Sequence, residues 1–159
     1  MTIVSTAPNI STLIPNPLPE PMGILCESIL DSTFSSASSA GTDKILWNIH
    51  PDKTIEFIDN IVVAANTSIT VGKQITTLDE IASKNYETFI VPFYGQTNYR
   101  NGIMFLRIDN QKKLVFRGAW YPSGTTVNYY GGSSNPLNLS ESLIINLRGI
   151  VIGCGYSLY

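Results

Sequence analysis

The chain has 159 residues, of which 43% are hydrophobic and 14% are charged, and its formal net charge at pH 7 is −2. A domain of this length buries roughly 70% of its unfolded surface, so its core depends on neither a disulfide nor a metal ion. The ten lysines and arginines are scattered, which excludes a basic stripe for a phosphate backbone. We therefore expect no nucleic-acid partner and a surface that is neutral or covered by protein.

Residues 1–22, MTIVSTAPNISTLIPNPLPEPM, are expected to form an extended arm. Each proline removes a backbone donor and biases the residue before it toward β or polyproline geometry. The arm is therefore excluded as a central strand, and it lacks the charged start and apolar run of a signal peptide. We expect it to pack on a neighbouring subunit or another protein of the assembly, and residues 23–159 to form a single β domain. No apolar run long enough for membrane insertion is present.

Short strands are expected after the arm, separated by Pro, Asp and Asn turns. The expected ranges are 23–34, 44–49, 54–58, 61–65 and 68–71. Residues 35–41, SSASSAG, have the composition of a flexible surface loop. Residues 76–83 are expected to form one helical turn, because Thr77 is followed three residues later by Glu80 in a capping pattern.

Residues 86–121 read as three strands separated by two turns. Within residues 102–109, Met104, Leu106 and Ile108 share one face, whereas Ile103 and Phe105 lie on the other. Because both faces carry apolar side chains, burial on both sides is expected, either between sheets or against another subunit.

A further strand is expected at residues 125–130, a loop at 131–136 and one or two closing strands within 142–159. Arg148 is the only charged residue between residues 142 and 159, so we expect this closing segment to be central in a sheet or buried in an interface. The spacing of strands and turns predicts an all-β fold, either an antiparallel, jelly-roll-like sandwich or a barrel. Cys26 and Cys154 are expected to be buried thiols rather than a disulfide.

Candidate catalytic groups are few. His50 is the only histidine, so a catalytic triad or a zinc site would have to be built around it. The pairs Asp79 with Glu80 and Asp52 with Glu56 have the composition of a glycosidase pair, but acids at turns are commonly solvated. We expect no enzyme activity, no metal site and no cofactor.

Aromatic residues beside Gly-, Asn- and Ser-rich turns are the better candidates for a ligand site. The expected binding residues are Asn98, Tyr99, Arg100, Trp120 and Tyr121. Flat rings beside adaptable hydrogen-bonding groups suit a sugar ring. The alternative is that these rings fill the core or a subunit interface, where Tyr, Trp and Arg are also enriched.

The segment 74–130 resembles the head domain of tailed-phage receptor-binding and baseplate adhesin proteins. The resemblance is carried by Leu78 and by the stretches 89–93, 96–101, 107–110 and 114–118. It implies a homotrimeric virion protein that binds host cell-surface saccharide, and it assigns no individual binding residue. The chain has a Pro-rich arm where that family has a coiled-coil or triple-helical shoulder. The alternative is therefore a virion structural protein, such as a capsid decoration or tail-assembly component, whose arm contacts its neighbours.

Overall fold

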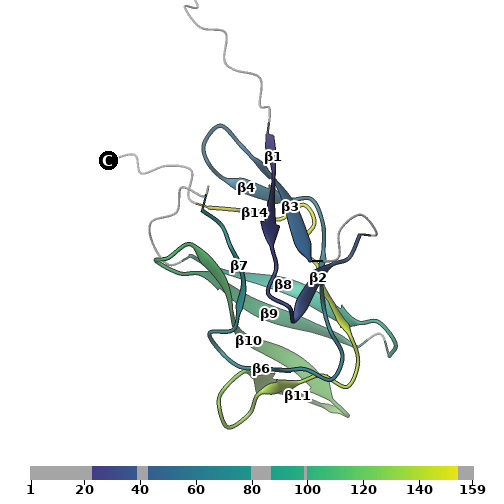
Figure 1. Cartoon of the computed structure of the whole chain (residues 1–159). Coiled ribbons are helices and arrows are strands. Elements are labelled where there is room, and N and C mark those ends of the chain that lie inside the picture. Colours follow the sequence, from purple (N-terminus) through teal and green to yellow (C-terminus); the bar gives the residue numbers. More distant parts are fainter. Residues whose placement is uncertain (1–22, 39–42, 80–86, 99, 154–159) are drawn as a thin grey trace, which may run out of the picture.

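The computed structural model describes residues 23–38, 43–79, 87–98 and 100–153. Every regular element in these ranges is a β-strand, and the strands form two main sheets (Figure 1). The predicted all-β class is confirmed. No helix in the described ranges is long and apolar enough to cross a membrane.

The smaller sheet has four antiparallel strands. In spatial order they are β1 (Ile24–Ile29), β3 (Lys44–Ile49), β4 (Ile55–Phe57) and β14 (Val151–Ile152). Strand β3 shows why this segment forms a strand, because Ile45, Trp47 and Ile49 alternate into the core between half-buried neighbours. Strand β3 thus has one fully buried face.

The larger sheet has eight antiparallel strands. Its main path is β11 (Thr126–Tyr130), β10 (Lys113–Ser123), β9 (Asn101–Ile108), β8 (Glu87–Gly95), β13 (Leu143–Ile145), β5 (Ile61–Val63) and β2 (Phe34–Ser36), and β7 (Gln74–Thr77) pairs with β10. The path ends at β11 and at β2, so the sheet is not closed. Of the two expected architectures the sandwich is confirmed and the barrel is wrong.

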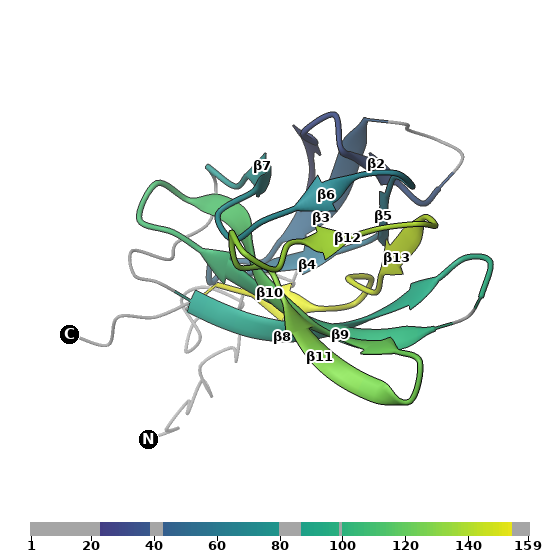
Figure 2. The same cartoon turned by 90° about the horizontal axis from the view of Figure 1, so that it is seen from below.

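A third, two-stranded sheet is formed by β6 (Ser68–Ile69) and β12 (Leu137–Asn138), which lie side by side in Figure 2. Ile69 and Leu137, directly paired in this ribbon, are both buried. They belong to the one hydrophobic cluster that also takes in the inner side chains of both main sheets. The described residues therefore share a single core.

Two local expectations are wrong. Thr76 and Thr77 lie in strand β7 and pair with Leu114 and Lys113 of β10, so the helical turn expected from residue 76 does not form there. This tertiary pairing, with Ile75 and Leu78 buried, outweighs the local capping pattern, whose Glu80 lies outside the described residues.

The short strand expected within residues 23–34 is confirmed as β1, whereas the loop expected at 35–41 is wrong at its start, because Ser35 and Ser36 belong to β2. The chain turns at Asp31, whose Oδ1 accepts the Thr33 N–H at 3.0 Å, and this turn separates β1 from β2. Ser35 and Ser36 then pair with Val62 and Ile61 of β5. Because of this long-range pairing, Ser35 and Ser36 belong to an edge strand of the larger sheet.

The closing segment is partly as expected. Strand β13 is central, between β8 and β5, whereas β14 is an edge strand of the smaller sheet. Cys26 is half-buried and packs against the core. Cys154 lies outside the described residues, so the two buried thiols stay a prediction.

Among the residues that the structure describes, burial on both faces of β9 is not found. Met104, Leu106 and Ile108 are buried as expected, but Ile103 is 40% exposed and Phe105 is half-buried. The second face points away from the core rather than between the sheets. Its burial against another subunit stays a prediction.

Truncating Phe57 tests the shared core. Phe57 is fully buried on β4, so we expect Phe57→Ala to lower the free energy of unfolding by roughly 3–5 kcal/mol. Ile29→Ala is the control, because Ile29 is 70% exposed and its truncation is expected to cost less than about 0.5 kcal/mol. Urea unfolding followed by fluorescence measures both. Equal losses would show that Phe57 lies outside the cooperative core.

Candidate functional site

Trp120 and Tyr121 lie on opposite faces of the large sheet. They are consecutive residues of β10, and consecutive side chains of a strand point to opposite faces. Trp120 is 42% exposed on the face away from the core. Tyr121 is half-buried on the other face, with its ring centroid 5.5 Å from that of Phe93. The predicted aromatic site is therefore divided into two surfaces.

The first surface is an apolar band across β8, β9, β10 and β11, called here the outer apolar face. It comprises Ile90, Pro92, Ile103, Phe105, Trp120, Pro122, Val127 and Tyr129. One row crosses all four strands, because Pro92 pairs with Ile103, Ile103 with Trp120, and Trp120 with Tyr129. A depression of about 480 Å³ lies beside the middle of this row and includes Ile103, Trp120 and Val127 in its lining.

The Tyr129 side chain lies on this face because Gly118 leaves room for it. Its hydroxyl donates to the Arg117 carbonyl at 2.8 Å, which carries the side chain across Gly118. A Cβ at Gly118 would collide with that hydroxyl, and the Gly118 φ of 147° is also unfavourable for other residues. The ring then contacts Trp120 at 5.7 Å and Phe105 at 6.2 Å between centroids.

The second surface is a depression of about 240 Å³ on the Tyr121 side of the sheet, called here the polar pocket. It is lined by Arg100, Tyr121, Pro122, Tyr130, Leu137, Asn138 and Ser140. These residues come from the β8–β9 loop, from β10 and β11, and from β12 with the residues after it. The pocket thus combines two tyrosine rings with a guanidinium, an amide and a hydroxyl.

Glu141 anchors the loop that supplies Arg100. Its Oε2 accepts the backbone N–H groups of Thr97 at 2.8 Å and Asn98 at 2.9 Å, and its Oε1 accepts the Asn98 Nδ2 at 3.3 Å. These hydrogen bonds, led by the Asn98 N–H, hold the pKa of Glu141 below its usual value. Gly95, at the end of β8, leaves room for the carboxylate, which a Cβ there would meet.

Tyr121 connects this anchor to the pocket. Its burial, and then the charge of Glu141, raise the pKa of the Tyr121 phenol, against the opposing effect of Arg100. The phenol therefore keeps its proton at neutral pH and can both donate and accept a hydrogen bond.

Three predicted site residues are brought together by this geometry. Asn98, Arg100 and Tyr121 gather around Glu141, whereas Trp120 lies on the outer apolar face and Tyr99 lies outside the described residues. Glu141 itself was missed by sequence reasoning. One signal was available, because Glu141 is the only acid after Asp109 and stands in a run of neutral residues.

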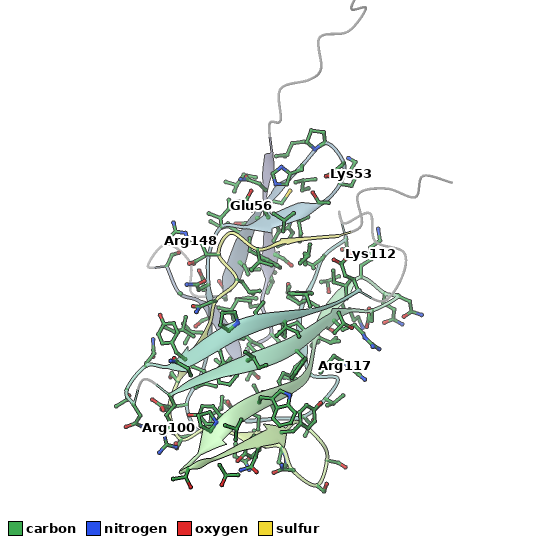
Figure 3. All side chains as sticks on the ribbon, turned by 180° about the vertical axis from the view of Figure 1, so that it is seen from behind. Lys53, Glu56, Arg100, Lys112, Arg117 and Arg148 are labelled. Carbon is green, nitrogen blue, oxygen red and sulfur yellow. The ribbon has the colours of Figure 1, made fainter. Side chains whose placement is uncertain are left out.

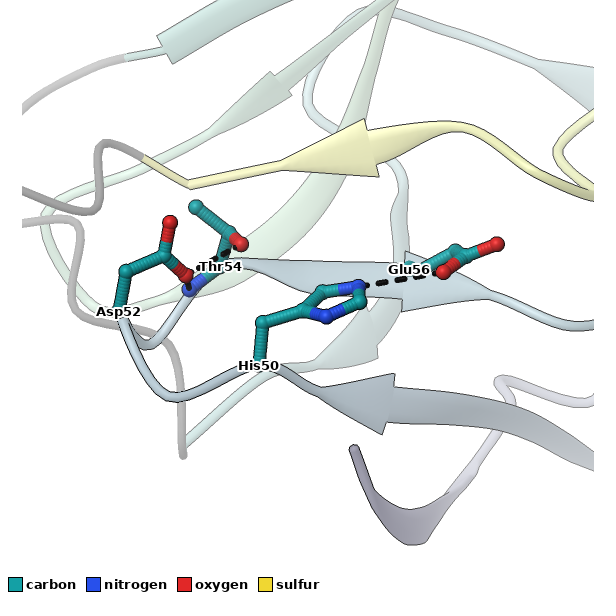
Figure 4. Close-up of polar contacts among 4 residues, drawn as sticks. All are labelled: His50, Asp52, Thr54 and Glu56. Atoms are coloured by element: carbon teal, nitrogen blue, oxygen red, sulfur yellow. Dashed lines mark hydrogen bonds and ion pairs between the residues drawn. The ribbon is translucent and has the colours of Figure 1, made fainter. Parts of the chain in front are cut away.

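His50 lies in the β3–β4 hairpin and does not form a triad. Its Nε2 lies 3.1 Å from the Glu56 carboxylate, whereas the Thr54 hydroxyl donates to Asp52 at 2.6 Å rather than to the imidazole (Figure 4). Asp52 also accepts the Thr54 N–H, and these two hydrogen bonds lower its pKa. The contacts are those of a side-chain-stabilised turn.

Within the described ranges, no group of three or more His, Cys, Asp or Glu side chains is placed to hold a metal ion. Comparison of the chain with family models, curated proteins and solved structures gives no match.

Neutralising Glu141 is expected to loosen the β8–β9 loop. Glu141→Gln keeps the size of the side chain but replaces one acceptor oxygen by a donor, so we expect a lower melting temperature at pH 7. Because the folded-state pKa is lowered, the carboxylate stabilises the fold above the unfolded pKa of about 4.3 and loses this effect as pH falls through the folded pKa.

The difference in melting temperature between wild type and Glu141→Gln should therefore shrink as pH falls from 6 to below about 4. Glu27→Gln is the matched control, because Glu27 makes an exposed ion pair with Lys44 and should change the melting temperature little. A constant difference across this pH range would contradict the role given to the Glu141 charge.

Proposed function

We propose that the chain is a saccharide-binding head domain of a tailed-phage virion protein and that it binds host cell-surface saccharide in the polar pocket. The observation that carries the proposal is the joining of Tyr121 and Tyr130 with Arg100, Asn138 and Ser140 around one depression. A sugar presents an apolar C–H face and a rim of hydroxyls. Tyrosine rings match the first, and the polar side chains match the second.

The size of the pocket favours a single terminal sugar unit. Its volume of about 240 Å³ is below the roughly 300–1,000 Å³ typical of pockets for drug-sized ligands. The charges beside it are of both signs, because Arg100 and Glu141 flank Tyr121. Such a site recognises hydroxyl groups by donating and accepting hydrogen bonds rather than by net charge.

Preorganisation also supports binding at this place. Glu141 ties down Thr97 and Asn98 next to Arg100, so part of the ordering cost of the loop is met before a ligand arrives. The assignment to a phage adhesin is supported by the resemblance of residues 74–130, which also implies a homotrimer.

The second candidate function is that of a virion structural protein without a ligand. It is favoured by the outer apolar face, where Trp120, Tyr129 and Val127 are 42%, 45% and 58% exposed. An exposed apolar band of this kind marks a protein contact. The two candidates use different faces of the sheet, so variants can separate them.

Binding is tested by a glycan screen on the purified full chain, followed by titration of the best ligand. Arg100→Gln and Asn138→Ala are expected to weaken binding about tenfold or more each, because each removes hydrogen bonds to hydroxyl groups. Arg148→Gln is the matched control. Arg148 is also exposed, but it lies toward the smaller sheet, away from Arg100 (Figure 3).

Trp120→Ala separates the two surfaces. Because Trp120 lies on the opposite face from Tyr121, we expect this variant to bind the glycan as the wild type does. Loss of binding in Trp120→Ala with normal binding in Arg100→Gln would move the ligand to the outer apolar face. Absence of any bound glycan would favour the structural role.

A further inference from the structure

The outer apolar face has no covering element among the described residues. Ile90, Ile103, Trp120, Val127 and Tyr129 are each between 40% and 58% exposed on four adjacent strands. The smaller sheet shares the core on the opposite face, so nothing in that core depends on this band. A continuous aromatic and aliphatic surface of this kind is an expected contact site.

The arm has a segment whose chemistry matches this face. Residues 15–21, PNPLPEP, carry a proline at every second position, which favours polyproline II geometry. In that geometry, with three residues per turn, Pro15, Leu18 and Pro21 would share one ridge at intervals of about 9 Å. Polyproline ridges dock on surfaces lined by aromatic rings.

The length and charge of residues 15–21 also match those of the outer apolar face. The row from Pro92 to Tyr129 crosses four strands, which at about 4.8 Å per strand spacing spans roughly 14 Å. The ridge from Pro15 to Pro21 covers about 19 Å. Glu20 is the only charged residue of the arm, and Arg107 lies on the same side of β9 as Ile103.

The position of β1 favours an arm from another copy of the chain as the segment that covers the outer apolar face. Leu18 precedes Ile24 by six residues, which span at most about 20 Å. Figure 1 shows the start of β1 at the end of the molecule opposite β11. The outer apolar face also points away from the smaller sheet, to which β1 belongs. A segment this close to β1 is poorly placed to cover the outer face of its own chain.

We propose that the outer apolar face binds residues 15–21 of a second copy of this chain, with the Pro15, Leu18 and Pro21 ridge lying across the strands over Ile103, Trp120 and Val127. This contact does not depend on saccharide binding, because it uses the opposite face of β10. Each copy then has one donor segment and one acceptor face, so copies associate by exchanging arms.

The test is a complementation experiment with full-length chains. Leu18→Asp damages the arm and leaves the acceptor face intact, whereas Val127→Asp places a charge in the acceptor face and leaves the arm intact. Each variant alone should self-associate about tenfold or more weakly than wild type in sedimentation equilibrium. Mixed together, they should form a 1:1 pair and no larger species, because the pair keeps one working arm on one working face.

Matched controls exclude a general effect of added charge. Val151→Asp replaces a valine that is 53% exposed on β14, against 58% for Val127, and should associate as wild type does. Leu13→Asp changes the arm outside residues 15–21 and should also be neutral. Circular dichroism and melting temperature confirm that each variant folds.

The proposal is overturned by any of three results. A monomeric wild type at micromolar concentration would leave no exchange to explain. Wild-type association by Leu18→Asp or by Val127→Asp would mean that another surface holds the copies together. Failure of the two folded variants to pair when mixed would show that the arm and the face are not partners.

Discussion

The period-two alternation of strands β8 to β11 is the constraint on which the rest of the structure depends. It sends Val91, Phe93, Met104 and Leu106 into the core and places Ile90, Ile103 and Trp120 on the opposite face. A shift of one residue in register would exchange the two faces completely. The core, the outer apolar face and the polar pocket are therefore consequences of one pairing pattern.

The buried charge of Glu141 orders the β8–β9 loop. Glu141 is 7% exposed, and its charge is tolerated because the N–H groups of Thr97 and Asn98 and the amide of Asn98 satisfy its carboxylate oxygens. The same contacts hold Thr97 and Asn98 in the loop that supplies Arg100 to the polar pocket. The Glu141 side chain, which is distant along the chain, thus orders the β8–β9 loop.

The two surfaces have different chemistry and suit different partners. The outer apolar face offers rings and aliphatic groups over several strands, which suits an extended apolar segment such as the arm. The polar pocket is small and joins two rings to groups that donate and accept hydrogen bonds, which suits a sugar unit. Under the two proposals made above, assembly and ligand binding use opposite faces of β10.

The sequence by itself determined the all-β class, the strand at residues 44–49 and the alternation in residues 102–109. These features follow from local composition and from periodicity along a single strand. Only the tertiary structure decided that Thr76 and Thr77 join a sheet, that Ser36 pairs with Ile61, that Trp120 faces away from Tyr121's pocket, and that Glu141 anchors the β8–β9 loop. Each of these depends on a partner that is distant along the chain or on the face that the sheet turns to the core. Local sequence propensity carries no information about the distant pairing partner or about which face of the sheet packs on the core.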